Sequence, residues 1–576
     1  MLRPRLALSW LIVGAAMLLG TGLRLQHVGD RSMTHIEMYV PNIPMGTDLS
    51  VPKSRMDLWT VVTDTLSSDT HPPGYYVFMW FVTKCFGSGT LAIRLPSVLF
   101  GVGSIGLVFW LGVLIGQRTP ACVAAVFLAL NGYLIVWNKT GRMYSMVCFL
   151  GLLTTILLLL LARSDRHRRT LEIGYAALTL LGLATHVFFW AMLATQMLWV
   201  LGNAWAQNRP MPRLLNVQIL IVILGSPLLA SAAYQSVNQV AFVSSVPVMA
   251  REYIQFVYLI PGWDDTWAPG GAPALALAPQ FFLPRVILFL LCVLLLIVGI
   301  RRLKPAGERL LGEPAGSFGG AWLAAAVLAV ITILAHIAIA VHHLQPKPTL
   351  KYTKAMTVLP LLLVFAATLL RKSWDGLRNW CSRWSFKFLQ GGPPLVWMLA
   401  VGPFALLVIA SVVFWPLTDP RRLLFLAPYL LLTLAIGAVR LGQRSRWLAL
   451  SLFLILGALH GFSVWAYSNR SVGPVDYKEF ADKLKPHLQS DDLIFLRREW
   501  DTTPILYYVK PDHYHLLASN FVDACRRNPN ARVWALLFHG EELPAAMEPA
   551  LKEYREVETV EVYLARGVLY CRGPCR

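Results

Sequence analysis

Long apolar runs are the feature that most constrains this chain. About thirteen of them approach the length of a bilayer-spanning helix, which needs about 20 residues. They lie near residues 7–27, 97–116, 121–137, 143–162, 171–187, 189–204, 213–232, 283–300, 320–342, 353–370, 394–415, 422–438 and 446–467. Only 14% of the residues are charged, whereas soluble domains carry about 25%. The sequence therefore predicts an all-α polytopic membrane protein with about 13 transmembrane helices.

The net charge of +20 is unevenly distributed along the chain. Residues 472–576 contain 16 acidic and 14 basic residues, which leaves 15 acidic and 37 basic residues in the first part. The excess positive charge thus lies in loops between apolar segments, where membrane orientation rules and anionic lipids place it. This distribution argues against nucleic acid as a partner and indicates a lipid bilayer.

The basic loops also predict the orientation of the chain. With Met1 in the cytoplasm, the short basic loops all fall inside, at Arg118, 163–169, 209–213, 301–309, 371–387 and 440–446, as the positive-inside rule requires. This holds only if the short apolar stretch 75–86 does not cross the membrane. We therefore expect interfacial helices in a first outer loop, residues 28–96.

The C-terminal part differs in composition from the rest. Short β-rich runs alternate with amphipathic helices after residue 469, which is typical of a small α/β domain. We expect a transmembrane domain over 1–469 and an extracytoplasmic α/β domain over 470–576. One structural disulfide among Cys525, Cys571 and Cys575 is compatible with an oxidising compartment.

Ionisable residues gather on the expected outer face. Charges beside the hydrocarbon are costly, so we treat them as candidates for function. They include Asp69 and His71 in the first outer loop and the segment 138–144. Further along lie His186, the cations 342–354, and the segment 419–422. Arg and Lys can hold a phosphate, and a carboxylate can act as general base on an acceptor hydroxyl.

Several motifs at these positions resemble one known family. They are THPPGYY at 70–76, IRLPSV at 93–98, GRMYSM at 141–146, ATHVFFW at 184–190 and PRRLLFLAPYLLL at 420–432. In this order they resemble the dolichyl-phosphate-mannose protein mannosyltransferase superfamily, glycosyltransferase family 39 and its bacterial relatives. The resemblance implies a multi-spanning fold that transfers a sugar from a polyprenyl-phosphate carrier.

The resemblance also implies a catalytic acidic residue soon after the first helix. Relatives carry an Asp-Glu pair there, whereas this chain has Ile36 before Glu37. Glu37 is the first candidate for the base, with Asp30 and Asp69 behind it. His71 stands where the aminoarabinose transferases carry a donor-contacting lysine and joins Glu37 as a catalytic candidate. The candidate substrate-binding residues are Asp69, Arg142, Tyr144, His186, Lys354, Arg421 and Arg422.

We therefore expect an enzyme of the plasma (inner) membrane that transfers a monosaccharide from a polyprenyl-phosphate donor to an extracytoplasmic acceptor. The acceptor is a protein, lipid or polysaccharide. A divalent cation is compatible with His342 and His343, but no ligand spacing supports a metal site, and no cofactor is assigned. The alternatives are a lipid or sugar transporter or flippase, and a non-catalytic member of the same fold.

Overall fold

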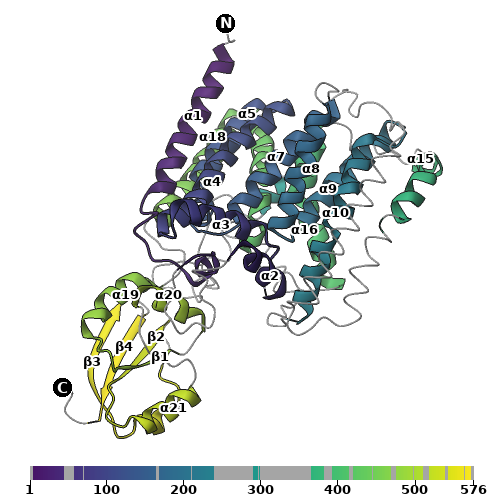
Figure 1. Cartoon of the computed structure of the whole chain (residues 1–576). Helices are drawn as coiled ribbons and strands as arrows, with labels where there is room; N and C mark the ends of the chain where they lie inside the picture. Colours follow the sequence, from purple (N-terminus) through teal and green to yellow (C-terminus); the bar gives the residue numbers. More distant parts are fainter. Residues whose placement is uncertain are drawn as a thin grey trace.

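A bundle of apolar helices and a small C-terminal sheet make up the computed structural model (Figure 1). It describes residues 4–43, 57–68, 71–163, 168–208, 210–238, 290–295, 297–298, 363, 365–381, 392–413, 420–443, 445–468, 475–496, 499–509, 518–538, 542–545, 547–562 and 565–572. Among the described residues, helices lie within a few residues of the bounds expected for 7–27, 143–162, 171–187, 189–204, 394–415 and 446–467. The prediction of a helical membrane protein with a small C-terminal sheet is confirmed at this level.

The bundle consists of helices that pack side by side. They are α1 (Pro4–Leu25), α4 (Thr90–Leu114), α5 (Arg118–Leu130), α6 (Gly132–Asn138), α7 (Tyr144–Arg163), α8 (Arg168–Thr185), α9 (Phe189–Ala206), α10 (Arg213–Asn238), α16 (Gly392–Val413), α17 (Ala427–Gly442) and α18 (Arg446–Ser468). The core lies between α4, α5, α7 and α17, where Phe109, Leu128, Leu158 and Ile436 are almost fully buried.

Shorter helices flank the bundle. They are η1 (His35–Tyr39), α2 (Leu58–Ser68), α3 (Gly74–Phe86), α15 (Trp374–Cys381) and η6 (Pro420–Leu426). The thirteen residues of α3 form the short helix expected at 75–86. Its position at a membrane interface stays a prediction.

Five described helices are long and apolar enough to cross a membrane: 7–25, 90–114, 144–163, 422–442 and 446–465. The bent pair α5 and α6 makes a sixth if it is counted as one span. The protein is thus a membrane protein. The predicted total of 13 spans stays a prediction, because the expected helix 320–342 and most of 283–300 and 353–370 lie outside the described residues.

The expected single helix over 121–137 is wrong, because the chain bends by 61° between α5 and α6. Asn131 begins the second helix: its side chain accepts a hydrogen bond from the Leu134 amide at 2.9 Å, as an N-cap does. Arg24 of α1, which is fully buried, fills the break. Its guanidinium donates to the carbonyls of Leu128 and Ala129 at 3.0 Å each.

These two carbonyls belong to the last turn of α5, where no intrahelical partner is available and the helix dipole favours a cation. Arg24 also donates to the carbonyl of Gly20 at 3.0 Å and to Asn138 Oδ1 at 2.8 Å. Arg24 therefore joins the end of α5 to the end of α6.

The C-terminal unit, residues 475–572, contains a four-stranded sheet in the order β1-β2-β4-β3. Its elements are α19 (Tyr477–Leu484), η7 (Lys485–His487), β1 (Leu493–Leu496), α20 (Glu499–Val509), α21 (Ala518–Arg527), β2 (Val533–Phe538), α22 (Glu548–Leu551), β3 (Arg555–Val562) and β4 (Ala565–Cys571). Strands β1 and β2 are parallel, with Leu493 opposite Val533, and the other pairs are antiparallel.

Alternate residues of the central strands face two separate apolar clusters. Trp534 and Leu536 pack with Phe480 of α19, whereas Val533 and Ala535 pack with Cys525 of α21. This period of two is the strand pattern. Cys571 is disulfide-bonded. The described Cys525 is free. The division into domains 1–469 and 470–576 stays a prediction.

The C-terminal unit lies at the end of the bundle where α3 is found, whereas α1 begins at the opposite end (Figure 1). Helix α20 packs against η1 of the first loop. The end of α1, the first loop and the C-terminal unit thus meet at one end of the molecule.

The Arg24 contacts predict that this side chain is needed for stability. In Arg24→Met four acceptors lose their cationic donor, and each such hydrogen bond is worth about 1.5–3 kcal/mol. We expect a clear fall in the unfolding temperature, measured by tryptophan fluorescence in detergent. The control Arg446→Met, at an exposed position, should change it little; equal effects of the two variants would contradict the assignment.

Candidate functional site

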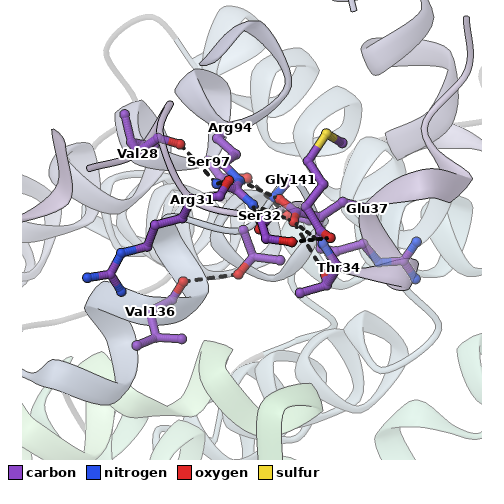
Figure 2. Close-up of polar contacts among 12 residues, drawn as sticks. Val28, Arg31, Ser32, Thr34, Glu37, Arg94, Ser97, Val136 and Gly141 are labelled. Carbon is purple, nitrogen blue, oxygen red and sulfur yellow. Dashed lines mark hydrogen bonds and ion pairs between the residues drawn. The ribbon is translucent and has the colours of Figure 1, made fainter. Parts of the chain in front are cut away.

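A buried ion pair between Glu37 and Arg94 forms the centre of the site (Figure 2). Arg94 Nε donates to Glu37 Oε1 at 2.7 Å, and Arg94 Nη2 donates to Glu37 Oε2 at 2.8 Å. Glu37 is 0% and Arg94 is 3% exposed. The two parallel bonds form the bidentate pair that a guanidinium and a carboxylate make best.

The local sequence positions the carboxylate. Thr34 precedes η1, and its backbone amide donates to Glu37 Oε2 at 3.0 Å in a capping box. The Thr34 hydroxyl donates to the same oxygen at 3.3 Å. Glu37 is thus held by hydrogen bonds within its own turn as well as by Arg94.

Arg94 also holds the chain that precedes η1. Its guanidinium donates to the carbonyls of Val28, Arg31 and Ser32 at 3.0, 3.1 and 2.7 Å (Figure 2). These carbonyls belong to irregular backbone. One side chain of α4 therefore anchors both the carboxylate and the segment leading to it.

A third element reaches the pair from the connection between α6 and α7. The Gly141 amide donates to Glu37 Oε1 at 2.9 Å. A Cβ at Gly141 would lie 2.4 Å from Ile93 Cγ2, so a side chain larger than hydrogen does not fit there without a shift. The glycine permits this close approach.

The charge of Arg94 decides the ionisation of Glu37. Burial by itself raises the pKa of a carboxyl group, but the Arg94 charge and the hydrogen bonds from Arg94, Gly141 and Thr34 lower the pKa of Glu37 below its usual value. Glu37 is therefore an ionised carboxylate at neutral pH, with both oxygens engaged.

Arg142 lies next to this pair. Its Nη1 donates to the Tyr76 hydroxyl at 3.1 Å and to the Ile36 carbonyl at 3.3 Å. Its guanidinium also lies over the rings of Tyr39 and Tyr76, at 5.9 and 5.8 Å from their centroids, within the range of a cation–π contact. Helix α3 and η1 thus both contact Arg142, which is only 5% exposed.

His71, Tyr144 and His186 form a row of rings. The His71 and His186 centroids are 5.6 Å apart, and those of His186 and Tyr144 are 6.2 Å apart. The Phe188 amide donates to His186 Nδ1 at 3.1 Å, so the proton of neutral His186 is on Nε2. The start of α3, close to His71, packs tightly against the end of α8. A Cβ on Gly74 would lie 2.6 Å from the Ala184 carbonyl oxygen.

Lys139, which directly follows α6, lies in the candidate segment 138–144 but was not among the predicted substrate-binding residues. It is 6% exposed, and its Nζ has no hydrogen-bond partner among the described residues. Desolvation, followed by the charges of Arg31, Arg24 and Arg94, lowers the pKa of Lys139 to about 8. Its neighbour Asn138 binds Arg24.

The other predicted site residues are only partly covered by the described part of the chain. Asp69 and Lys354 lie outside the described residues, as does the side chain of Arg421. Arg422 is partly buried in η6, which packs on α7. Asp30 is exposed and lies 3.5 Å from His27.

The role of Arg94 was also not predicted from the sequence. It was visible as the lone charge in the apolar run 91–116, which is itself a signal for function. Within the described residues, no group of three His, Cys, Asp or Glu side chains could hold a metal ion.

Part of the chain is similar to a known protein family. Residues 70–230 match the family model described as dolichyl-phosphate-mannose-protein mannosyltransferase. The predicted family resemblance is confirmed. The matched segment includes His71, Arg94, Lys139, Arg142, Tyr144 and His186, but it begins after Glu37. No curated protein sequence matches the chain.

The similar solved structures described next share little sequence identity with this chain. ArnT from Cupriavidus metallidurans in the apo state is 14% identical, with a TM-score of 0.45, over 99% of this chain and 100% of that chain. The Archaeoglobus fulgidus oligosaccharyltransferase is 12% identical, with a TM-score of 0.44, over 91% and 67%. The arabinofuranosyltransferase AftD from Mycobacteria is 12% identical, with a TM-score of 0.41, over 98% and 41%.

The lowered pKa of Glu37 predicts a pH-dependent stability. The ion pair contributes its full stabilisation above the unfolded-state value of 4.5, and this is lost as the pH falls through the lower folded-state value. At pH 7, Glu37→Gln leaves Arg94 buried and unpaired, which costs about 3–5 kcal/mol. The difference in unfolding temperature between wild type and Glu37→Gln should therefore shrink from about pH 5 to about pH 3.

The matched control is Glu479→Gln, which removes an exposed ion pair with Lys483. Such pairs contribute little, so this variant should resemble wild type at both ends of the range. A wild-type advantage over Glu37→Gln that stays constant down to pH 3 would contradict the role of the ionised pair.

Proposed function

We propose that the protein is a membrane glycosyltransferase that transfers a monosaccharide from a polyprenyl-phosphate donor to an acceptor outside the cytoplasm. The observation that carries the proposal is an excess of buried positive charge around the connection between α6 and α7. Arg24, Arg94, Lys139 and Arg142 are 0–6% exposed, and Glu37 is the buried carboxylate described among them.

Buried charge without a partner is strongly unfavourable. Glu37 balances Arg94, and Arg24 is satisfied by carbonyls and Asn138. Lys139 Nζ has no hydrogen-bond partner among the described residues, and Arg142, three residues further along the chain, donates to the Ile36 carbonyl and the Tyr76 hydroxyl. Clustered buried cations of this kind suit an anionic ligand, and phosphate is an anion that both Lys and Arg bind.

The matching family supports a lipid-linked phosphate as this anion, because its description names dolichyl-phosphate-mannose. Among the similar structures, one of ArnT is bound to undecaprenyl phosphate, and one of an archaeal oligosaccharyltransferase contains a dolichol-phosphate. We propose the same class of donor here, with the outer end of the bundle as the site of transfer.

The proposed reaction is a single displacement. The acceptor hydroxyl attacks the anomeric carbon, the bond from that carbon to the phosphate oxygen breaks, and the polyprenyl phosphate leaves with the bonding electrons. The acceptor proton passes to a base. Lys139 and Arg142 stabilise the charge that grows on the leaving phosphate, the kind of interaction that contributes most to catalysis. His71 and His186 line the region beside Tyr144.

Lys139 gives the sharpest test of phosphate binding. In Lys139→Met the stem is retained and the charge is lost. We expect the affinity for undecaprenyl phosphate in detergent to fall about tenfold or more, the value of one charge-assisted hydrogen bond. The ligand-free variant should be at least as stable as wild type, because an unpaired buried charge is removed.

Wild-type affinity should also fall as the pH rises through about 8, where Lys139 loses its proton, and the variant should lack this step. The control is Lys84→Met, an exposed lysine of α3, which should bind like wild type. Unchanged affinity in Lys139→Met would remove Lys139 from the phosphate site.

The role of Glu37 requires a separate experiment. We predicted it as the general base, yet its oxygens accept bonds from Arg94, Gly141 and Thr34. If Glu37 is the base, Glu37→Gln should abolish transfer and keep lipid-phosphate affinity. If it holds the cations in place, affinity and transfer should fall together. Turnover of labelled polyprenyl-phosphate sugars and equilibrium binding separate the two outcomes.

A non-catalytic role in binding the donor lipid is the second candidate. It is favoured by Ile36, which replaces the acidic residue of relatives, and by the full engagement of Glu37. Binding of undecaprenyl phosphate without turnover of any sugar donor in a panel would support it over the enzyme.

A further inference from the structure

The C-terminal unit contacts the site segment through one buried hydrogen bond. The Met33 amide donates to the Tyr508 hydroxyl at 2.7 Å. Met33 is fully buried, and α20, which carries Tyr508, packs on η1. A second contact lies at the edge, where Lys478 Nζ donates to the Asp30 carbonyl at 3.3 Å.

The contacted segment is the one that Arg94 holds from the other side. Its carbonyls at Val28, Arg31 and Ser32 accept from Arg94, and the Thr34 amide donates to Glu37. The Met33 amide lies between Ser32 and Thr34 and points instead to Tyr508. Residues 26–34 have no regular helix or strand, so these side-chain contacts define their path.

The segment 28–34 is linked through Glu37 to the connection between α6 and α7, which carries Lys139 and Arg142. Glu37 is placed by Thr34 and Arg94, and Glu37 in turn accepts from the Gly141 amide. Gly141 lies between Lys139 and Arg142. A chain of direct contacts therefore runs from α20 through Met33 and Thr34 to Glu37 and then to the two candidate phosphate ligands.

We infer that Tyr508 is a positioning residue of the site: its hydroxyl fixes the segment 28–34 against Arg94 and thereby sets the place of Lys139 and Arg142. The C-terminal unit then contributes to the donor site indirectly, by positioning its residues and not by contacting the donor. Burial raises the pKa of Tyr508 to about 12, so the hydroxyl stays neutral over the working pH range.

Hydrogen exchange of the full-length protein in detergent tests the inference without a substrate. In Tyr508→Phe the Met33 amide loses its acceptor. We expect exchange about fivefold faster or more in peptides covering 28–40. Faster exchange should also appear in peptides covering 139–147, because the Gly141 amide depends on Glu37.

Two further variants serve as controls. Tyr554→Phe removes another phenol of the C-terminal unit, which donates to the Pro529 carbonyl on the surface; exchange in both segments should match wild type. Lys478→Ala removes the exposed contact to Asp30 and should loosen only 28–34. Unchanged exchange at 139–147 in Tyr508→Phe would overturn the inference and leave a local packing contact.

The last readout rests on the proposed function. Tyr508→Phe should weaken undecaprenyl phosphate binding several-fold, whereas Tyr554→Phe should not. Loosened exchange at 139–147 with unaltered affinity would overturn the positioning of the donor site. If wild type does not bind the lipid at all, the proposed function fails. The exchange at 139–147 still decides whether Tyr508 of α20 positions the connection between α6 and α7.

Discussion

The Glu37–Arg94 ion pair is the interaction on which the end of the bundle beside the C-terminal unit depends. A fully desolvated pair is stable only when the remaining donors and acceptors are also satisfied. Here the backbone amides of Thr34 and Gly141 and three carbonyls of the first loop complete the set. Removal of either charge would therefore disturb the loop, α4 and the connection between α6 and α7 at once.

Much of the fold could be predicted from the sequence because its signals are local. The apolar length of 144–163 predicts α7, and the alternating pattern after residue 490 predicts the strands of the C-terminal unit. The break at Asn131 could not be predicted in this way. The 121–137 run is apolar enough for one span, and Arg24, which bonds the carbonyls at the break, lies more than one hundred residues earlier.

The candidate site could likewise be predicted only where its signals are local in the sequence. Glu37, Arg142, His71 and His186 were selected as charged or polar residues beside apolar helices, and the structure places them on neighbouring elements. The sequence could not reveal that Glu37 is paired with Arg94, because 57 residues separate the two. Nor could it reveal that Lys139 has no described partner, since that depends on which side chains reach its buried position.

The capping of α5 by Arg24 has a consequence for biosynthesis. The carbonyl acceptors of Arg24 lie 104 and 105 residues further along the chain, so they do not yet exist when α1 leaves the ribosome. An unpaired guanidinium is costly within the hydrocarbon. The contact between α1 and α5 through Arg24 can therefore be completed only after α5 has been synthesised.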